Sequence, residues 1–358
     1  MKLEQVLKIA VRGGASDIIL KVGSLPRFRH NGQMLSLADG MEITEEMMNH
    51  WLDIILPRRL YHRLEEKGDV DFGYDSPNKT RFRVNVFRQC GKYAVVLRVI
   101  NDQLQSIEQL QLPKIIEKVT NMKRGLVLVT GASGSGKSTT LTAIINHINQ
   151  SRSSHIITIE DPIEYYYSDK LSTINQREIG EDTPSFASAL RASLRQDPDI
   201  ILVGELRDKE TTETALMAAD TGHLVFSTLH TKDAVDSLSR LMSYFDAHQH
   251  RSLKNQLANS LQMVISQRLI PKTAEKGRIV AAEILVVNAF VRDVILKESH
   301  FEALGEAINK GQKNYGMQSF DQALLKMLKN GIISEEQAIA EASSRENMRL
   351  LISGVGAG

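Results

Sequence analysis

The sequence predicts an α/β protein: a parallel sheet with helices around it, preceded by a small α+β domain. Residues 125–130 form an apolar run that predicts a buried strand, and a glycine-rich loop and a helix over 138–149 follow it. From about residue 113 onward, apolar strand patterns alternate with helical patterns, which is typical of a parallel sheet. The chain has 358 residues, which is long enough for two domains of ordinary size.

The first domain is expected over residues 1–100. Apolar residues at helical spacing predict a helix that begins near Leu3 and ends at Gly13-Gly14. Thr44 is a suitable cap for a second helix, which we expect over 44–56. Strand patterns occur over 17–22, 27–30, 33–37, 81–88 and 93–100. The two strands around Asn31-Gly32 are expected to form a hairpin, because that dipeptide favours a tight turn.

A polar connector is expected over residues 101–112, and the second domain over 113–358. Its strands are predicted over 126–130, 155–160, 200–203 and 224–229. Its clearest helices are predicted over 187–195 and 211–219. Past Ser252 we expect mainly helix. Ser334, with a glutamine three residues later, has the capping-box pattern of a last helix, and Gly331 is placed to end the helix before it.

Composition excludes several classes of protein. The 44 basic and 43 acidic residues nearly cancel, which argues against a general nucleic-acid or membrane-coating protein. The single cysteine, Cys90, cannot form an internal disulfide or a cysteine-based zinc site. The N-terminus has no apolar secretory core, and no run of 18 apolar residues occurs. We therefore expect a soluble intracellular protein that reaches a membrane only through a partner.

The most specific local motif is a phosphate-binding loop, G-x-x-x-x-G-K-[ST], at residues 131–138. Its glycines allow a tight turn whose N–H groups face phosphate oxygens, and the following helix adds the positive end of its dipole. The lysine is expected to reach the β- and γ-phosphates of ATP and the serine to bind Mg²⁺. The residues expected to bind nucleotide are Gly131, Ser133, Gly134, Ser135, Gly136, Lys137, Ser138 and Thr139.

Carboxylates follow two of the predicted strands. One strand ends in Glu160-Asp161-Pro162-Ile163-Glu164, and another apolar run ends at Gly204-Glu205. Ligands bind beyond the carboxyl ends of strands in such sheets, so acids there can activate water or orient it on Mg²⁺. The second run fits the Walker B pattern, with Glu205 as an Mg²⁺ ligand in part through water. A solvated acidic turn and a buried strand with an exposed glutamate are the plainer alternatives.

A histidine and three arginines complete the candidate site. His230 ends a predicted strand at the same edge as the loop, where it could contact the γ-phosphate; a purely structural histidine is the alternative. Arg81 and Arg83 share one face of a strand in the first domain, and Arg98 lies on the strand expected to pair with it. These guanidinium groups could reach a triphosphate, or they could simply form an ion-paired surface.

Taken together, these segments resemble the secretion ATPase superfamily, and within it the type IV pilus retraction ATPases, the PilT/PilU group. Residues 194–208, LRQDPDIILVGELRD, are similar to the family signature L-R-x-D-P-D-x-[IL]-x-[IV]-G-E-[ILM]-R-D. Residues 160–164 resemble its Asp box, and 221–231 resemble its His box. The resemblance covers nearly the whole chain.

The resemblance implies a RecA-like P-loop ATPase core, a PAS-like N-terminal α+β domain and a helical C-terminal region. It implies a cytoplasmic ring of six subunits that hydrolyses ATP with Mg²⁺, drives pilus retraction and twitching motility, and docks on a platform protein of the inner membrane. The residues to which it gives catalytic roles are Glu164, Glu205, His230, Arg81, Arg83 and Arg98.

Two sequence features bear on which motor this is. Assembly ATPases usually carry a long N-terminal extension and a four-cysteine zinc site, which a chain with one cysteine lacks. The C-terminal helix of retraction motors reads A-I-R-N-L-I-R-E, whereas here Leu296 replaces the second arginine. An accessory PilU-like ATPase that depends on a paralogous retraction ATPase therefore stays open, as does a motor of a related secretion or conjugation pilus.

Other classes of function also stay open. A nucleotide-regulated binding module that hydrolyses ATP slowly would share these motifs. A RecA-like DNA motor is disfavoured by the near-neutral charge and by the lack of a stretch combining aromatic and basic residues. A small-molecule kinase is disfavoured because no substrate lid is evident.

Overall fold

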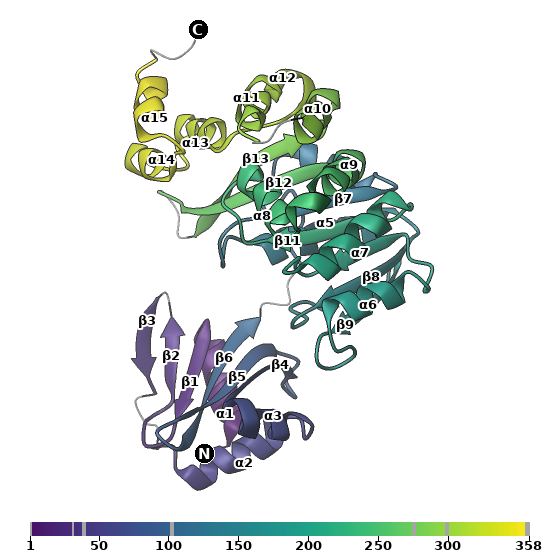
Figure 1. The fold of residues 1–358 in the computed structure, drawn as a ribbon. Helices are drawn as coiled ribbons and strands as arrows, with labels where there is room; N and C mark the ends of the chain where they lie inside the picture. Colours follow the sequence, from purple (N-terminus) through teal and green to yellow (C-terminus); the bar gives the residue numbers. More distant parts are fainter. Residues whose placement is uncertain are drawn as a thin grey trace. The chain divides into compact units, whose positions relative to one another are not determined.

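The computed structural model describes residues 2–30, 32–37, 41–100, 104–273, 277–297 and 301–354. The chain divides into two compact units (Figure 1). The first comprises Met1–Gln103 together with Pro162–Tyr166, and the second comprises Leu104–Asp161 and Tyr167–Gly358. The five residues Pro162–Tyr166 therefore pack with the N-terminal unit although they come from the middle of the chain.

The first unit is a six-stranded antiparallel sheet with helices, in strand order β3-β2-β1-β6-β5-β4. Its elements are α1 (Leu3–Arg12), β1 (Asp17–Lys21), β2 (Arg27–His30), β3 (Gln33–Ser36), α2 (Glu45–Ile55), α3 (Leu60–Lys67), β4 (Asp69–Asp75), β5 (Arg81–Gln89) and β6 (Lys92–Ile100). Its core is built around Trp51 of α2 and Phe82 of β5, both almost fully buried. Asn31 of the expected turn lies outside the described residues.

Two elements of this unit, α3 and β4, are not indicated by the sequence pattern. α3 buries only Leu60 and Leu64, so its apolar stripe is too narrow to stand out. β4 carries Asp69, Asp71 and Gly73, residue types that are rare in strands, and it is held by its pairing with β5. Tertiary pairing has overridden local preference in both places.

The second unit is built on a seven-stranded sheet in the order β13-β12-β7-β11-β10-β8-β9. All neighbouring pairs are parallel except β12 with β13. Its strands are β7 (Gly125–Thr130), β8 (His155–Glu160), β9 (Thr173–Glu178), β10 (Ile200–Val203), β11 (Leu224–Leu229), β12 (Leu261–Pro271) and β13 (Arg278–Val286). The four strands that the sequence predicts here are therefore present, in a parallel arrangement.

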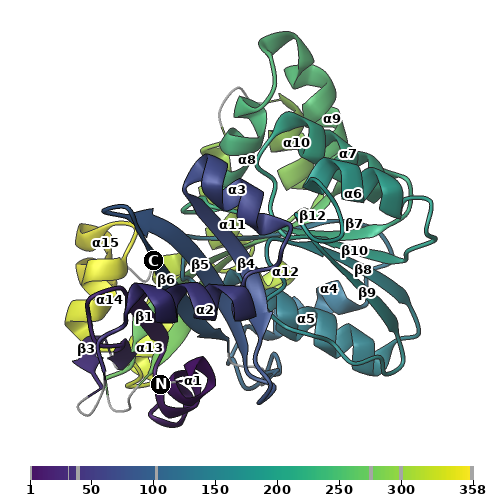
Figure 2. The same cartoon turned by 90° about the horizontal axis from the view of Figure 1, so that it is seen from below.

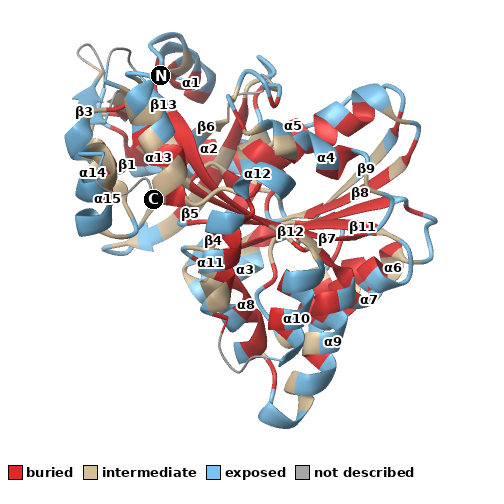
Figure 3. Cartoon of the chain, turned by 90° about the horizontal axis from the view of Figure 1, so that it is seen from above, coloured by how far each residue is buried: buried red, intermediate tan, exposed pale blue. Residues whose placement is uncertain are grey.

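Helices cover both faces of this sheet (Figure 2). Alternate residues of β7 enter opposite cores: Leu126 and Leu128 belong to one apolar cluster, Val127 and Val129 to the other. Buried residues therefore run through the centre of the unit (Figure 3). Two short helices precede β7: η1 (Lys114–Ile116) and α4 (Glu117–Thr120). The helices between β7 and β12 are α5 (Lys137–Ser151), α6 (Phe186–Ser193), α7 (Lys209–Asp220), α8 (Ala234–Ser243), η2 (Ala247–Gln249) and α9 (His250–Ser260).

Two expectations about this unit need correction. The segment after Ser252 is not helical throughout, because β12 and β13 form a long antiparallel pair over 261–271 and 278–286. α9 ends at Ser260 and β12 starts at the next residue, so no glycine or proline marks the change of structure. The expected polar connector is also partly core: Ile107 and Leu112 are buried in the second unit, while residues 101–103 lie outside the described residues.

The rest of the chain is helical, as expected. Its helices are α10 (Ala289–Lys297), α11 (Ala303–Lys310), α12 (Gln312–Tyr315), α13 (Phe320–Lys329), α14 (Glu335–Glu341) and α15 (Arg345–Ile352). Ser334 caps α14 through the expected capping box with Gln337, and Gly331 adopts φ +68° just after α13. In the ranges that the structure describes, no helix is both long and apolar enough to cross a membrane.

Candidate active site

The loop between β7 and α5 has the geometry that phosphate binding requires. Gly131 has φ +144°, and a Cβ there would lie 2.5 Å from both the carbonyl oxygen of Gln267 and Oγ of Ser135. Gly136 adopts the left-handed conformation, φ +92°, immediately before α5. Only glycine fits the narrow space at 131 and the left-handed backbone at 136. The loop therefore packs closely against β12, and the N-terminus of the 15-residue helix α5 points at a ligand bound in the loop.

The polar groups of this loop are held ready for an anionic ligand. Lys137 is 8% exposed, and its Nζ donates to the carbonyl oxygens of Gly131 (2.9 Å) and Ala132 (3.0 Å). Oγ of Ser135 is buried and has no hydrogen-bond partner within the described part of the chain. A buried hydroxyl without a partner is costly, and a phosphate oxygen would satisfy it. The loop therefore fits the phosphates of a nucleotide.

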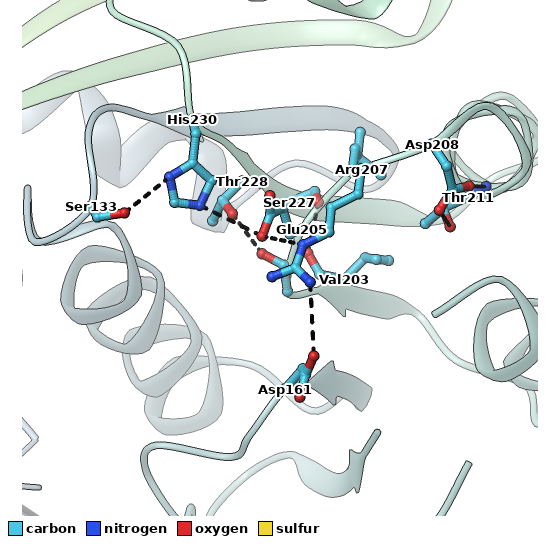
Figure 4. A network of polar contacts seen from close by, with 12 residues as sticks. Ser133, Asp161, Val203, Glu205, Arg207, Asp208, Thr211, Ser227, Thr228 and His230 are labelled. Carbon is cyan, nitrogen blue, oxygen red and sulfur yellow. Dashed lines mark hydrogen bonds and ion pairs between the residues drawn. The ribbon is translucent and has the colours of Figure 1, made fainter. Parts of the chain in front are cut away.

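Glu205 and His230 meet beside this loop (Figure 4). They follow the neighbouring parallel strands β10 and β11, whose carboxyl ends lie at one edge of the sheet. Nε2 of His230 is 3.5 Å from Oε2 of Glu205, and its Nδ1 is 3.5 Å from Oγ of Ser133 in the loop. The imidazole thus lies between the Glu205 carboxylate and the loop at 131–138.

The backbone around Glu205 is fastened to β11. Oγ1 of Thr228 donates to the carbonyl oxygen of Gly204 at 2.6 Å, and the backbone N–H of Leu206 donates to Thr228 at 3.1 Å. Oγ of Ser227, which is buried, donates to Val203 at 2.7 Å. These side-chain hydroxyls explain why the strand before His230 carries Ser-Thr: they fix the turn from which the Glu205 carboxylate projects.

Arg207 is a site residue whose role the sequence pattern does not indicate. Its Nε donates to Oε2 of Glu205 at 2.8 Å, and its Nη1 lies 3.9 Å from Oδ2 of Asp161 (Figure 4). The guanidinium therefore connects the acids that follow β10 and β8. Its position two residues after Glu205 in the sequence is the only hint of a contact with that carboxylate. Spacing alone does not indicate the direction in which an exposed arginine side chain points.

The chain after His230 is anchored on its other side by a buried carboxylate. Oε1 of Glu283, on β13, accepts a hydrogen bond from the backbone N–H of Ala234, the first residue of α8, at 3.0 Å. Thr231 and Ser237 share a buried hydroxyl–hydroxyl contact of 2.7 Å. The segment that carries His230 is thus fixed to both β11 and β13.

The three acids of the Asp box do not stay together. Glu160 ends β8 and accepts from Thr158 at 2.7 Å. Asp161 belongs to the second unit and faces Arg207. Glu164 lies in Pro162–Tyr166, which belongs to the first unit, whereas Glu160, Asp161 and Glu205 belong to the second.

The three N-terminal arginines have different surroundings. Arg81 is buried, whereas the side chains of Arg83 and Arg98 are 41% and 68% exposed. Arg83 and Arg98 are directly opposite each other on β5 and β6. Each has an acid beside it: Nε of Arg98 is 3.0 Å from Asp17, and Nε of Arg83 is 3.9 Å from Asp71. Two partly exposed cations side by side favour an anion.

Residues 2–344 match the family model described as type II/IV secretion system protein. The chain belongs to this family. It is 40% identical over 348 residues to the type IV pilus retraction ATPase PilT of Pseudomonas aeruginosa, covering 97% of this chain and 100% of that protein. It is 36% identical over 352 residues to the type IV pilus ATPase PilU of that organism, covering 98% and 91% respectively. A crystal structure of the pilus retraction motor PilT with bound ADP superimposes with a TM-score of 0.89 at 42% identity, covering 97% and 98% of the two chains.

This secretion ATPase therefore has the predicted fold class: an α/β P-loop core, a small N-terminal α+β domain and a helical C-terminal region. It is an ATPase. The resemblance to the retraction ATPases that the signature at 194–208 indicates is confirmed.

Replacing Arg207 with alanine is expected to lower the ATP turnover of this secretion ATPase several-fold, because the Glu205 carboxylate loses the donor that orients it. Stability should change little, since the Arg207 side chain is 58% exposed. Turnover and thermal unfolding of Arg207→Ala and Arg207→Lys would check this, with partial activity in the lysine variant. A faster Arg207→Ala enzyme would mean that the arginine restrains Glu205 instead.

The free energy of unfolding of the ATPase is expected to depend on pH through Glu283. Burial raises the pKa of Glu283 from its usual 4.5 to about 7, and the nearby Asp233 adds to this rise, while the Ala234 N–H and Arg268 oppose it. A carboxyl whose pKa is raised by folding destabilises the fold as pH rises from about 4.5 to about 7. One pH unit corresponds to about 1.4 kcal/mol, so this penalty reaches at most about 3 kcal/mol above pH 7.

A comparison with Glu283→Gln isolates the destabilisation caused by ionised Glu283, because the amide oxygen of glutamine can still accept from the Ala234 N–H. The melting temperature of the glutamine variant minus that of the natural protein should increase between pH 5 and pH 7.5 and then level off. A difference that does not vary with pH would show that the Glu283 carboxyl has an ordinary pKa.

Proposed function

We propose that this secretion ATPase is the motor of type IV pilus retraction, and so of twitching motility. It would work as a ring of six subunits at the cytoplasmic face of the inner membrane, docked on a platform protein. The observation that carries the proposal is the group formed by Lys137, Glu205 and His230 around one sheet edge, in a chain that aligns with PilT over 97% of its length. That group suits hydrolysis of a nucleoside triphosphate.

Each residue of the site has a distinct task in this proposal. The loop N–H groups and Lys137 bind the phosphates of ATP, and Glu164 accepts a proton from the attacking water. Glu205 orients that water, and His230 relays the state of the γ-phosphate to β11. The oxygen donors of Ser138 and Glu205 are of the kind that Mg²⁺ prefers; when bound, the ion would neutralise phosphate charge.

Arg83 and Arg98 are the arginines best suited to reach the nucleotide of a neighbouring subunit. They are adjacent and partly exposed, so they can exchange their acid partners for phosphate oxygens. Transition-state charge on a transferring phosphoryl group is stabilised by such arginines.

Mixed rings test this arrangement. Arg98→Ala and Lys137→Ala proteins should each be inactive alone, because one lacks the arginine and the other the phosphate-binding lysine. Co-assembled, the Arg98→Ala subunits keep an intact loop and receive an arginine from a Lys137→Ala neighbour. ATP turnover should therefore reappear on mixing; a mixture as inactive as its components would contradict transfer between subunits.

The accessory alternative has one observation in its favour. Leu296 on α10, where retraction motors have an arginine, is 41% exposed and so offers an apolar rather than a cationic surface. Deletion of the gene in its host, followed by rescue with the natural gene or with Lys137→Ala, would test the main proposal. Pili that no longer retract, restored only by the natural gene, would support it. Retraction that persists without the gene would contradict it and favour the accessory role.

A further inference from the structure

The side chain of Arg81 is buried among its partners, unlike those of Arg83 and Arg98. It is the first residue of β5, opposite Asp75 of β4, and its side chain is only 7% exposed. Its Nη1 donates to Oδ2 of Asp75 at 2.8 Å. An arginine side chain keeps its charge in proteins, so a guanidinium buried this far must be paired and hydrogen-bonded on several sides.

Two further partners of Arg81 come from Pro162–Tyr166. Nε donates to the carbonyl oxygen of Ile163 at 2.8 Å, and Nη1 also donates to the hydroxyl of Tyr166. The guanidinium carbon lies 4.2 Å from the centre of the Tyr166 ring, and the Tyr166 hydroxyl donates to Asp75 at 3.2 Å. These contacts hold the residue before Glu164 and the residue two positions after it.

Gly73 on β4 makes room for this arrangement. A Cβ at Gly73 would lie 2.4 Å from Nη2 of Arg81 and 3.0 Å from its guanidinium carbon. The backbone of Gly73 does not require glycine, since its φ is not positive. The glycine is therefore explained by the space that the guanidinium of Arg81 needs.

We propose that Arg81 is a positioning residue for Glu164: it fastens Pro162–Tyr166 to the sheet of the N-terminal unit, so that Glu164 moves with that unit. This rests on the proposed role of Glu164 in activating water. It replaces the expectation that Arg81 reaches nucleotide. Any rotation of the N-terminal unit then carries the Glu164 carboxylate with it, which couples domain movement to hydrolysis within one chain.

Three variants weaken the contacts between Arg81 and Pro162–Tyr166 in different ways. Arg81→Lys keeps the charge but loses the planar fork, Gly73→Ala displaces the guanidinium without altering it, and Tyr166→Phe removes only the hydroxyl. Arg88→Lys is the matched control: Arg88 lies on the same strand and contacts Tyr93 both by a 3.0 Å hydrogen bond and by stacking, away from Pro162–Tyr166.

The first measurement is hydrogen exchange at the backbone amides of Ile163 to Tyr167 in the full-length protein. These amides should exchange faster in Arg81→Lys and Gly73→Ala than in the natural protein or in Arg88→Lys, because their segment has lost its anchor. This readout does not depend on turnover or on Glu164. Unchanged exchange in both variants would overturn the proposal.

The second measurement is a double-mutant cycle on ATP turnover. Arg81→Lys should lower kcat by roughly tenfold to a hundredfold, as expected for a displaced catalytic group, with nucleotide affinity unchanged. In a Glu164→Gln background the same change should have no further effect, because Arg81 acts through Glu164. Full additivity would overturn the proposal and show that Arg81 acts independently. Normal turnover in Glu164→Gln alone would remove Glu164 from the mechanism and the positioning role with it, whatever the exchange data show.

Discussion

A Lys137→Ala protein is expected to have no measurable ATP turnover and greatly weakened nucleotide binding. Lys137 supplies the only ammonium held by the loop carbonyls of Gly131 and Ala132 within the described residues, and its charge is expected to transfer to phosphate oxygens. Without this ammonium group, neither the phosphate oxygens of the nucleotide nor the carbonyl oxygens of the loop have their lysine donor.

Turnover and the affinity for a fluorescent ATP analogue would be measured together. Lys310→Ala is a suitable control, because Lys310 is an exposed lysine whose pair with Glu306 on α11 is a surface salt bridge of little value. The melting temperature would show that Lys137→Ala is folded. Turnover within about twofold of the natural protein would remove Lys137 from the mechanism.

A Glu205→Gln protein is expected to bind ATP but to hydrolyse it at least roughly tenfold more slowly, which corresponds to about 1.4 kcal/mol of barrier. Glutamine has nearly the same shape, so the contacts of Gly204 and Leu206 with Thr228 should persist. The negative charge that faces Arg207 and His230 is lost, and with it the group expected to orient water.

Single-turnover kinetics would separate binding from hydrolysis in this variant. Glu210→Gln is the matched control, since Glu210 is an exposed acid paired with Arg191 on the neighbouring helix. Slow hydrolysis with normal affinity would agree with the role given to Glu205. A normal rate would mean that another acid orients the water, and Asp161 would be the next residue to replace.

Local motifs made the nucleotide-binding loop and the parallel strands predictable. The loop depends on glycines and a lysine within eight residues, and the four predicted strands of the second unit are apolar runs bounded by polar ends. β12 and β13 were not predictable in the same way. A helix ends at Ser260 and a strand begins at Leu261 with no turn residue between them, so only the pairing with β7 and β13 decides the structure there.

The site was predictable where it depends on strand order and unpredictable where it depends on side-chain direction. Glu205 and His230 meet because parallel neighbours end at one edge, which the sequence pattern implies. Arg81 could not be distinguished from Arg83 by alternation, since both face the same side of β5. The buried position of the Arg81 guanidinium depends on Gly73 and on Ile163, which lies 82 positions away in the chain.

The measurement that tests the proposed ring motor most directly is the mass of the purified protein in solution, with and without nucleotide, alongside its ATP turnover. A ring motor is expected to form a particle of six subunits that hydrolyses ATP and loses that activity in Glu205→Gln while keeping its mass. A monomer without turnover under both conditions would contradict the ring motor.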